Sequence, residues 1–359
     1  MPCTALFPLA GSEDGRLPRR HAARHHRSLA SMKTLLDVTV RNPGGATPSR
    51  CAAGQKATTE VIEPAGRLVA GRYRIRSLLG RGGMGRVWLA EDEMLDRPVA
   101  LKQFDLSDEA SDMTRKSARV QALNEARAAA RVDHVGAVKI HDVVREDDCP
   151  WIVMEMLSGR TLAEALASAG PLPIDQVTGI GLGLLDVLQA THRAGIVHRD
   201  VKPANVHLCD DGRVVLMDFG IARTVADRST VSSGLLAGSP AYISPEQFRC
   251  GSVGPESDLF SLGATLFAAV EGSAPFDKGD LFATLTAVVV DVPGPFRRAG
   301  RLRPVIEGLL VKEPDQRLSA DQARAALRAT RLERPAPRTA HRRFTRAAEP
   351  PTFELPVAC

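Results

Sequence analysis

The first half of the chain alternates between apolar and polar residues, whereas the second half shows helical spacing. Alternation in "RVWLAE" and "PVALKQF" predicts two or three strands over residues 73–104. An alanine-rich stretch over 114–132 predicts a helix, and 137–147 and 150–157 predict further strands. After about residue 158, helical patterns dominate, over 161–170, 175–195, 258–272 and 319–330. Strands followed by helices predict an α+β protein with a sheet-rich front and a helical back.

The two ends of the chain lack this periodicity and carry its basic charge. Residues 1–66 hold 9 Lys and Arg against 5 Asp and Glu, and residues 331–359 hold 6 against 3. The segment 67–330, which we predict to be the folded domain, holds 32 against 34. A slightly acidic core argues against nucleic-acid binding by the domain. We interpret both ends as solvated, disordered extensions, with contact to an anionic surface as the alternative.

Composition and apolar runs indicate an ordinary globular protein, with 44% apolar and 25% charged residues. The most apolar segments, "LFSLGATLFAAV" and "LFATLTAVVV", are shorter than the roughly 18 residues that a membrane-spanning helix needs. They predict buried helices. Without a span or a secretory signal, we expect a cytoplasmic protein. The six cysteines have no metal-ligand spacing, so we expect them to be ordinary reduced thiols.

A glycine-rich stretch, "GRGGMGRV", interrupts the predicted strands. It places glycines at Gly80, Gly82, Gly83 and Gly85. Glycine allows a backbone to approach a ligand closely. A dinucleotide-binding loop would be followed by a helix, but strand-like "RVWLA" follows here. A hairpin folded over a ligand is therefore favoured, with a tight turn that binds nothing as the alternative.

Lys102 lies within the apolar strand "VALKQF". A buried ammonium group requires an anionic partner. That partner is either a phosphate of a ligand or a carboxylate of the alanine-rich helix, where Glu125 fits best. A lysine that merely reaches past the strand to solvent is the alternative.

The polar run "HRDVKPAN" over 198–205 is followed by "MDFG" over 217–220. Pro203 is incompatible with a helix interior and predicts a loop. Taken alone, this stretch would be a solvated loop. Together with the glycines and Lys102, its acids, amide and lysine indicate a site for a magnesium-bound polyphosphate, since Mg²⁺ prefers oxygen ligands. Such a site suits phosphoryl transfer, which depends on positioning and charge neutralisation.

These motifs together resemble the eukaryotic-type (Hanks-type) serine/threonine protein kinases, in particular their bacterial members. The resemblance covers roughly residues 73–330, with every main motif in order. It implies a two-lobed fold, with an N-lobe over about 73–155 and a helical C-lobe over about 158–330. It also implies ATP bound in the cleft between the lobes, with Mg²⁺ or Mn²⁺, and serine or threonine hydroxyl groups of proteins as phosphate acceptors.

The resemblance assigns roles to individual residues. Asp200 matches the catalytic aspartate that accepts the hydroxyl proton, and Lys202 the lysine that marks serine/threonine specificity. Lys102 matches the lysine that holds the α- and β-phosphates, and Glu125 its ion-pair partner. Asn205 and Asp218 match the metal ligands. The positions that match the nucleotide-binding residues are Leu79, Gly80, Gly82, Gly83, Gly85, Val87, Ala100, Lys102, the gatekeeper Met154, the hinge residues Glu155, Met156 and Leu157, and His207.

Further positions follow from the same resemblance. Glu246 is expected to pair with Arg317, and Asp258 to bond the backbone of the catalytic loop. Ser239 and Ser244 replace the threonine and alanine of the related "GTPAYMAPEQ". Arg199, before the catalytic aspartate, implies a pocket for a phosphate on the activation loop. The hydroxyl candidates there are Thr224, Ser229, Thr230, Ser232 and Ser233. Autophosphorylation between two copies would require self-association.

One departure from the family pattern concerns His207, which stands where an apolar side chain usually packs under adenine. Lower or pH-dependent ATP affinity is one interpretation, and a neutral histidine that simply packs is the other. A pseudokinase or scaffold is the main alternative function, although Lys102, Asp200, Asn205 and Asp218 are all present. A kinase-fold enzyme acting on a small molecule is a further alternative.

Overall fold

The computed structural model describes residues 66–82, 85–104, 112–146, 149–219, 240–249 and 253–332. The predicted extensions over 1–66 and 331–359 therefore lie almost wholly outside the described residues, and their boundaries stay predictions. The activation-loop candidates between 220 and 239, and Gly83, also lie outside them.

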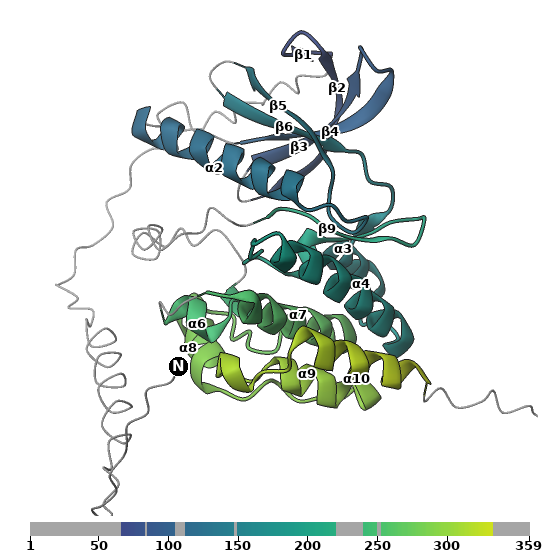
Figure 1. Cartoon of the computed structure of the whole chain (residues 1–359), viewed down its shortest axis with the longest axis vertical. Coiled ribbons are helices and arrows are strands. Elements are labelled where there is room, and N and C mark those ends of the chain that lie inside the picture. Colours follow the sequence, from purple (N-terminus) through teal and green to yellow (C-terminus); the bar gives the residue numbers. More distant parts are fainter. Residues whose placement is uncertain are drawn as a thin grey trace, which may run out of the picture. The chain divides into compact units, whose positions relative to one another are not determined.

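An antiparallel six-stranded sheet forms the first lobe, in the order β1-β2-β3-β4-β6-β5, and confirms the predicted strands (Figure 1). Its strands are β1 Leu68–Val69, β2 Tyr73–Gly82, β3 Gly85–Asp92, β4 Arg97–Gln103, β5 Ile140–Glu146 and β6 Cys149–Glu155. Neighbouring residues of a strand face opposite sides of a sheet. Val99 and Leu101 of β4 accordingly join a cluster with Trp88 on one face. Ala100 and Lys102 face the other side, toward the second lobe and the helix α2.

Helix α2, Asp112–Arg131, covers this second face of the sheet, as the alanine-rich pattern predicts (Figure 1). Ala122 and Ala126 pack there against Ile152 of β6 and Phe104. Small side chains at the contact let the helix lie close to the sheet, and Glu125 lies between these two alanines. Packing thus places Glu125 near Lys102.

The second lobe is mainly helical, so the two-lobed α+β fold is confirmed. Its helices are α3 Leu162–Ala169, α4 Ile174–Arg193, α6 Pro245–Phe248, α7 Pro255–Glu271, α8 Leu281–Val290, α9 Arg303–Leu309 and α10 Ala320–Leu332. Short 3-10 helices are η1 Pro203–Asn205, η3 Pro240–Tyr242, η4 Gly300–Leu302 and η5 Pro314–Gln316. A small sheet joins β7 Arg160–Thr161, β8 Val206–Leu208 and β9 Val214–Leu216 in that order.

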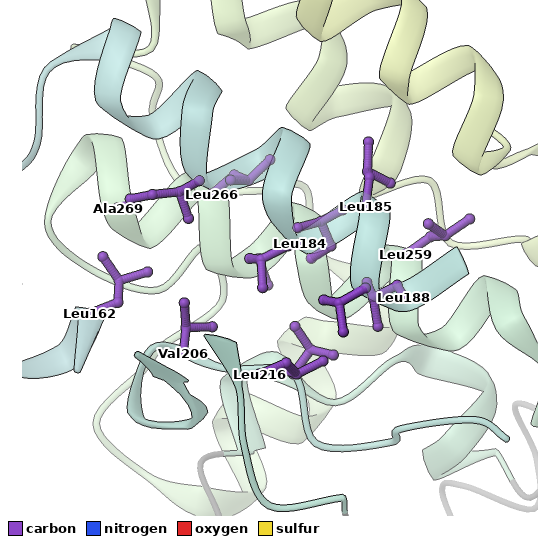
Figure 2. Packing of buried hydrophobic residues seen from close by; sticks show 14 of the residues in the cluster. Leu162, Leu184, Leu185, Leu188, Val206, Leu216, Leu259, Leu266 and Ala269 are labelled. Carbon is purple, nitrogen blue, oxygen red and sulfur yellow. The ribbon is translucent and has the colours of Figure 1, made fainter. Parts of the chain in front are cut away.

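Helix α7 lies at the centre of this lobe. It is apolar on all sides and buried over nearly its whole length, as the run "LFSLGATLFAAV" predicts. Leu184 and Leu188 of α4 pack in the same cluster as Leu259 of α7 and Leu216 of β9 (Figure 2). The cluster fixes the small sheet, whose strand ends carry the polar residues of the site. No helix in the described part of the chain has the length and apolarity needed to cross a membrane.

Hydrogen bonds tie the first lobe to the small sheet of the second. The segment between α2 and β5 forms a bridge with β9, in which the Leu216 amide donates to Gly136 O at 2.7 Å and the Val138 amide donates to Leu216 O at 3.2 Å. This contact lies two residues before Asp218, so it sets the position of Asp218 relative to the first lobe.

Candidate active site

Lys102 bonds to residues of both lobes. Its Nζ donates to Glu125 Oε1 at 2.6 Å and to Asp218 Oδ1 at 2.8 Å, and only 5% of its side chain is exposed. The ion pair predicted with Glu125 is therefore present, and Asp218 from the other lobe shares the same ammonium group. The interpretation of Lys102 as a lysine that reaches to solvent is wrong.

Electrostatics favour the charged forms of Lys102 and Asp218. Burial alone would lower the pKa of Lys102, but the carboxylates of Asp218 and Glu125 raise it above its ordinary value. Burial would raise the pKa of Asp218, but the Lys102 ammonium holds it below its usual range. Burial raises the pKa of Glu125 despite Lys102. Because 40% of the Asp218 side chain is exposed, its charge remains accessible to a ligand.

Asp200, Lys202 and Asn205 form a second polar group in the loop that leads into η1. Lys202 Nζ donates to Asp200 Oδ2 at 2.8 Å. Asn205 Nδ2 donates to the same oxygen and to the Asp200 carbonyl, each at 2.8 Å. Asp200 is 9% exposed and Asn205 4%. The loop predicted from Pro203 therefore holds one carboxylate in a fixed orientation.

The backbone of this loop is strained and is held from α7. Arg199 has φ 67°, a left-handed conformation that is uncommon for a residue with a side chain. Asp258 accepts from the amides of His198 at 2.8 Å and Arg199 at 2.7 Å, as expected. His192 Nε2 lies 2.7 Å from Asp258 Oδ2. Sequence reasoning missed His192, because nothing along the chain links α4 to α7.

His198 connects the two polar groups. Burial lowers its pKa despite the nearby carboxylates, so the imidazole is neutral. Its Nδ1 accepts from the Asp200 amide at 3.3 Å, and its Nε2 then donates to Met217 O at 3.1 Å. Its ring also contacts Phe219, with centroids 4.8 Å apart. The backbones of Asp200 and Asp218 are thereby held by one side chain.

The glycine-rich stretch forms the hairpin between β2 and β3, and not a strand-to-helix turn. Gly82 pairs with Gly85, and Gly80 pairs with Val87. Gly85 has φ 141°, and a Cβ there would lie 1.9 Å from Gln103 O, so no larger residue fits at this point. Leu79, just before the glycines, is 44% exposed.

The predicted apolar nucleotide-binding residues lie together. Ala100 and Met154 are buried members of one cluster, against which Val87 and Met156 pack while partly exposed. Leu157 is 8% exposed and belongs to the same cluster. These side chains come from β3, β4, β6 and the segment after β6. Together they form an apolar surface suited to a flat ring.

His207 lies in β8, with its Nε2 3.1 Å from Ser158 O. The imidazole is half-buried and bonded to the backbone of the segment after β6. This contact favours a packed histidine that supports the hinge. Its effect on nucleotide binding stays a prediction.

The side chain of Glu155 turns away from the apolar surface. Its Oε1 accepts from the Lys139 amide at 2.9 Å, and its Oε2 lies 3.4 Å from Arg213 Nη1. Arg213 lies between β8 and β9, so this pair is a further link between the lobes. Sequence reasoning missed it, and the backbone role predicted for Glu155 stays a prediction.

Asn205 and Asp218 offer oxygen ligands side by side. The Met217 amide donates to Asn205 O at 2.9 Å, which brings the end of β9 against η1. Since Asn205 Nδ2 is directed to Asp200, the amide oxygen remains for a ligand. A carboxylate and an amide oxygen are hard donors that suit Mg²⁺, which completes its shell with waters and phosphate oxygens. The residues therefore fit a divalent cation bound with a polyphosphate.

The described residues thus combine an ammonium group for phosphates, oxygen ligands for a cation and a fixed carboxylate for a hydroxyl proton. Comparison with known proteins agrees with this chemistry. The model of the protein kinase domain matches residues 73–326. The chain is 38% identical over 252 residues to serine/threonine-protein kinase PknL of Mycobacterium tuberculosis, covering 70% of this chain and 60% of PknL. It is 34% identical over 250 residues to serine/threonine-protein kinase PrkC of Bacillus subtilis, covering 69% and 38%. It is 38% identical over 276 residues to serine/threonine-protein kinase PksC of Streptomyces coelicolor, covering 72% and 49%. The chain thus spans less than two thirds of the length of these curated relatives.

Proposed function

This chain belongs to the protein kinase family, and on that premise we propose that it transfers the γ-phosphate of ATP to serine and threonine hydroxyl groups of proteins. Members of this family use ATP and a divalent metal ion. The observation that carries the proposal is the joint placement of Lys102, Asp218 and Asp200 by contacts from both lobes.

Each residue contributes a separate part of the activity. Lys102 directs its ammonium group toward the α- and β-phosphates while Glu125 keeps it in place. Asn205 and Asp218 would hold Mg²⁺, with Mn²⁺ as a substitute. Asp200 orients the acceptor hydroxyl and accepts its proton, and Lys202 keeps the Asp200 carboxylate in position. When bound, the metal–nucleotide complex supplies the phosphoryl group and neutralises the charge that develops during transfer.

Sequence features within the family support protein substrates. Lys202 is the residue that marks serine/threonine specificity, and the "SPE" segment is intact with Glu246 bonded to Arg317. The pseudokinase alternative requires a lost catalytic position, but the four positions Lys102, Asp200, Asn205 and Asp218 are all in place. Transfer to a small molecule has no supporting feature among the described residues.

Phosphate transfer to a generic basic protein substrate tests this proposal. We expect the wild type to incorporate label from γ-labelled ATP in a reaction that EDTA abolishes. Lys102→Met keeps the length of the side chain but removes its charge, so incorporation should fall by about 10²-fold or more. Thermal unfolding of the variant shows whether it is folded. Equal incorporation by the wild type and a folded Lys102→Met variant would contradict the proposal.

We further propose that the enzyme phosphorylates its own activation loop. Arg199 Nε is buried and has no hydrogen-bond partner in the described part of the chain, and a buried unpaired guanidinium nitrogen indicates a missing acceptor. A phosphate on Thr224, Ser229, Thr230, Ser232 or Ser233 is a suitable acceptor. Transfer between two copies would require at least transient self-association.

Mass spectrometry after incubation with ATP and Mg²⁺ checks this prediction. We expect phosphate on at least one of the five hydroxyl residues in the wild type and on none of them in Asp200→Asn. A rate per molecule that rises with protein concentration would identify transfer between copies. Active wild-type enzyme that carries no phosphate at any of the five positions would disprove autophosphorylation of this loop.

A further inference from the structure

Gln247 lies in the short helix α6, Pro245–Phe248, and its side chain is oriented by Ser244. Both the amide of Ser244, at 3.1 Å, and its hydroxyl, at 2.9 Å, donate to Gln247 Oε1. Because two donors face the amide oxygen, the amide nitrogen must point the other way. Ser244 is completely buried, and Gln247 is half-buried.

The nitrogen that is directed away from Ser244 reaches the catalytic loop. Gln247 Nε2 donates to Arg199 O at 3.3 Å. The amide of the same residue, Arg199, donates to Asp258 Oδ1 at 2.7 Å. Both backbone polar groups of the strained residue Arg199 are therefore held, one from α7 and one from α6.

The carbonyl held by Gln247 belongs to the peptide bond that joins Arg199 to Asp200. The N–H of that same peptide donates to His198 Nδ1 at 3.3 Å. Rotation of this peptide plane changes ψ of Arg199 and φ of Asp200, so it would move the Asp200 side chain. With its oxygen bonded to Gln247 and its N–H to His198, this plane cannot rotate without breaking a hydrogen bond.

We propose that Gln247 is a positioning residue for Asp200, acting through the Arg199 carbonyl. The inference rests on the proposed function, since Asp200 is the residue that receives the hydroxyl proton there. The side chain of Gln247 contacts no predicted nucleotide or metal ligand in the described residues. Its loss should therefore lower the rate of transfer and leave nucleotide binding almost unchanged.

A purely structural role is the competing explanation, because Gln247 also caps α6. Substitution by glutamate separates the two roles. A carboxylate accepts from both Ser244 donors, and glutamate is favoured at this position of a capping box and near a helix N-terminus. It offers no donor to Arg199 O. Gln247→Glu thus keeps the cap, removes the bond to the catalytic loop and places a carboxylate oxygen against Arg199 O.

Kinetics and unfolding of Gln247→Glu test the proposal. We expect kcat to fall by about ten-fold, since loss of one hydrogen bond lets the base move from its productive position. KM for ATP should stay within about two-fold of the wild type. The melting temperature should stay close to that of the wild type, because both contacts with Ser244 are kept. Amide exchange across 196–203 should be faster.

Gln189→Ala is a matched control. Gln189 Nε2 donates to Asp321 Oδ1 at 2.8 Å, and its Oε1 accepts from Arg324 between α4 and α10. This variant also loses glutamine hydrogen bonds, but none to the catalytic loop. We expect a lower melting temperature with unchanged kcat and unchanged exchange across 196–203.

Two outcomes would overturn the inference. One is a Gln247→Glu enzyme with wild-type kcat and wild-type amide exchange. The other is a loss of kcat that accompanies an equal loss of stability, as for a general structural defect. If the wild type itself transfers no phosphate, the proposed function fails, and amide exchange alone then decides whether Gln247 holds the Arg199–Asp200 peptide.

Discussion

Asp200→Asn will reduce phosphate transfer by about 10²- to 10⁴-fold, the range that a positioned general base contributes. Asparagine has the same shape, and it can still interact with Lys202 and Asn205, which both lie 2.8 Å from Asp200 Oδ2. It cannot accept the hydroxyl proton. Nucleotide affinity should change little, because Lys102 and Asp218 hold their own contacts without Asp200.

Two measurements check this expectation, namely steady-state kcat with a protein substrate and the Kd of a fluorescent nucleotide in the presence of Mg²⁺. Asp315→Asn is a suitable control, because Asp315 is exposed in η5 on the second lobe and undergoes the same chemical change. A variant at Asp200 that keeps more than about a tenth of wild-type kcat would show that another group accepts the proton.

Much of the fold could be predicted because its elements are long and periodic. Alternation in "RVWLAE" and "PVALKQF" predicts the strands β3 and β4, and the second of these contains Lys102. Glu125 on the alanine-rich helix is one of two anionic partners that the sequence offers for Lys102, and the structure contains this pair. By contrast, β7, β8 and β9 contain only two or three residues each, too few to show alternation.

The site was predictable where its chemistry is contiguous in the sequence. Asp200, Lys202 and Asn205 lie within six residues, and the family resemblance singles them out, although it does not predict their mutual contacts. The contacts from other elements that hold these three residues in place could not be predicted from the sequence. Gln247 acts through the backbone carbonyl of Arg199, and His192 acts through Asp258, which lies on a distant element. A hydrogen bond to a backbone atom does not depend on the side chain of the partner residue, so it leaves no signature in the sequence. The left-handed conformation of Arg199 is also hidden, because it occurs at a residue other than glycine.

Arg317→Met will lower the free energy of unfolding by about 3–5 kcal/mol, the usual effect of removing one partner from a buried ion pair. Arg317 donates to both oxygens of Glu246, at 2.9 and 3.1 Å, and its side chain is completely buried. It also donates to the carbonyls of Val311, Lys312 and Glu256. The variant leaves all of these acceptors without the guanidinium group.

Substitution of Glu246, the other partner of the ion pair, should lower the free energy of unfolding by a smaller amount. This difference distinguishes the two partners. Glu246→Gln keeps one acceptor oxygen for Arg317 and for the Ser257 hydroxyl, which donates to Glu246 Oε1 at 2.7 Å. The guanidinium group also keeps its carbonyl acceptors. We therefore expect Glu246→Gln to lower the free energy of unfolding by less than Arg317→Met does. The double variant Glu246→Gln/Arg317→Met should regain part of the stability that Arg317→Met loses, because it buries no unpaired charge.

The pH dependence of the stability lost in Arg317→Met identifies the cause of that loss. Burial would raise the pKa of Glu246, but the hydrogen bonds from Arg317 and Ser257 hold it below its ordinary value. A lowered pKa in the folded state stabilises the protein above the ordinary glutamate pKa, and this contribution is lost as pH falls through the lowered pKa. Without Arg317, burial raises the pKa of Glu246, so the variant regains stability when the carboxyl is protonated.

Urea unfolding of both proteins between pH 7 and pH 4 therefore gives a specific pattern. The difference in free energy between the wild type and Arg317→Met should be constant above about pH 6 and should shrink toward pH 4, because Glu246 binds a proton more readily in the variant. A difference that stays constant to pH 4 would mean that the loss comes from the packing of the arginine over Phe260 and from its carbonyl contacts, with no contribution from the Glu246 charge.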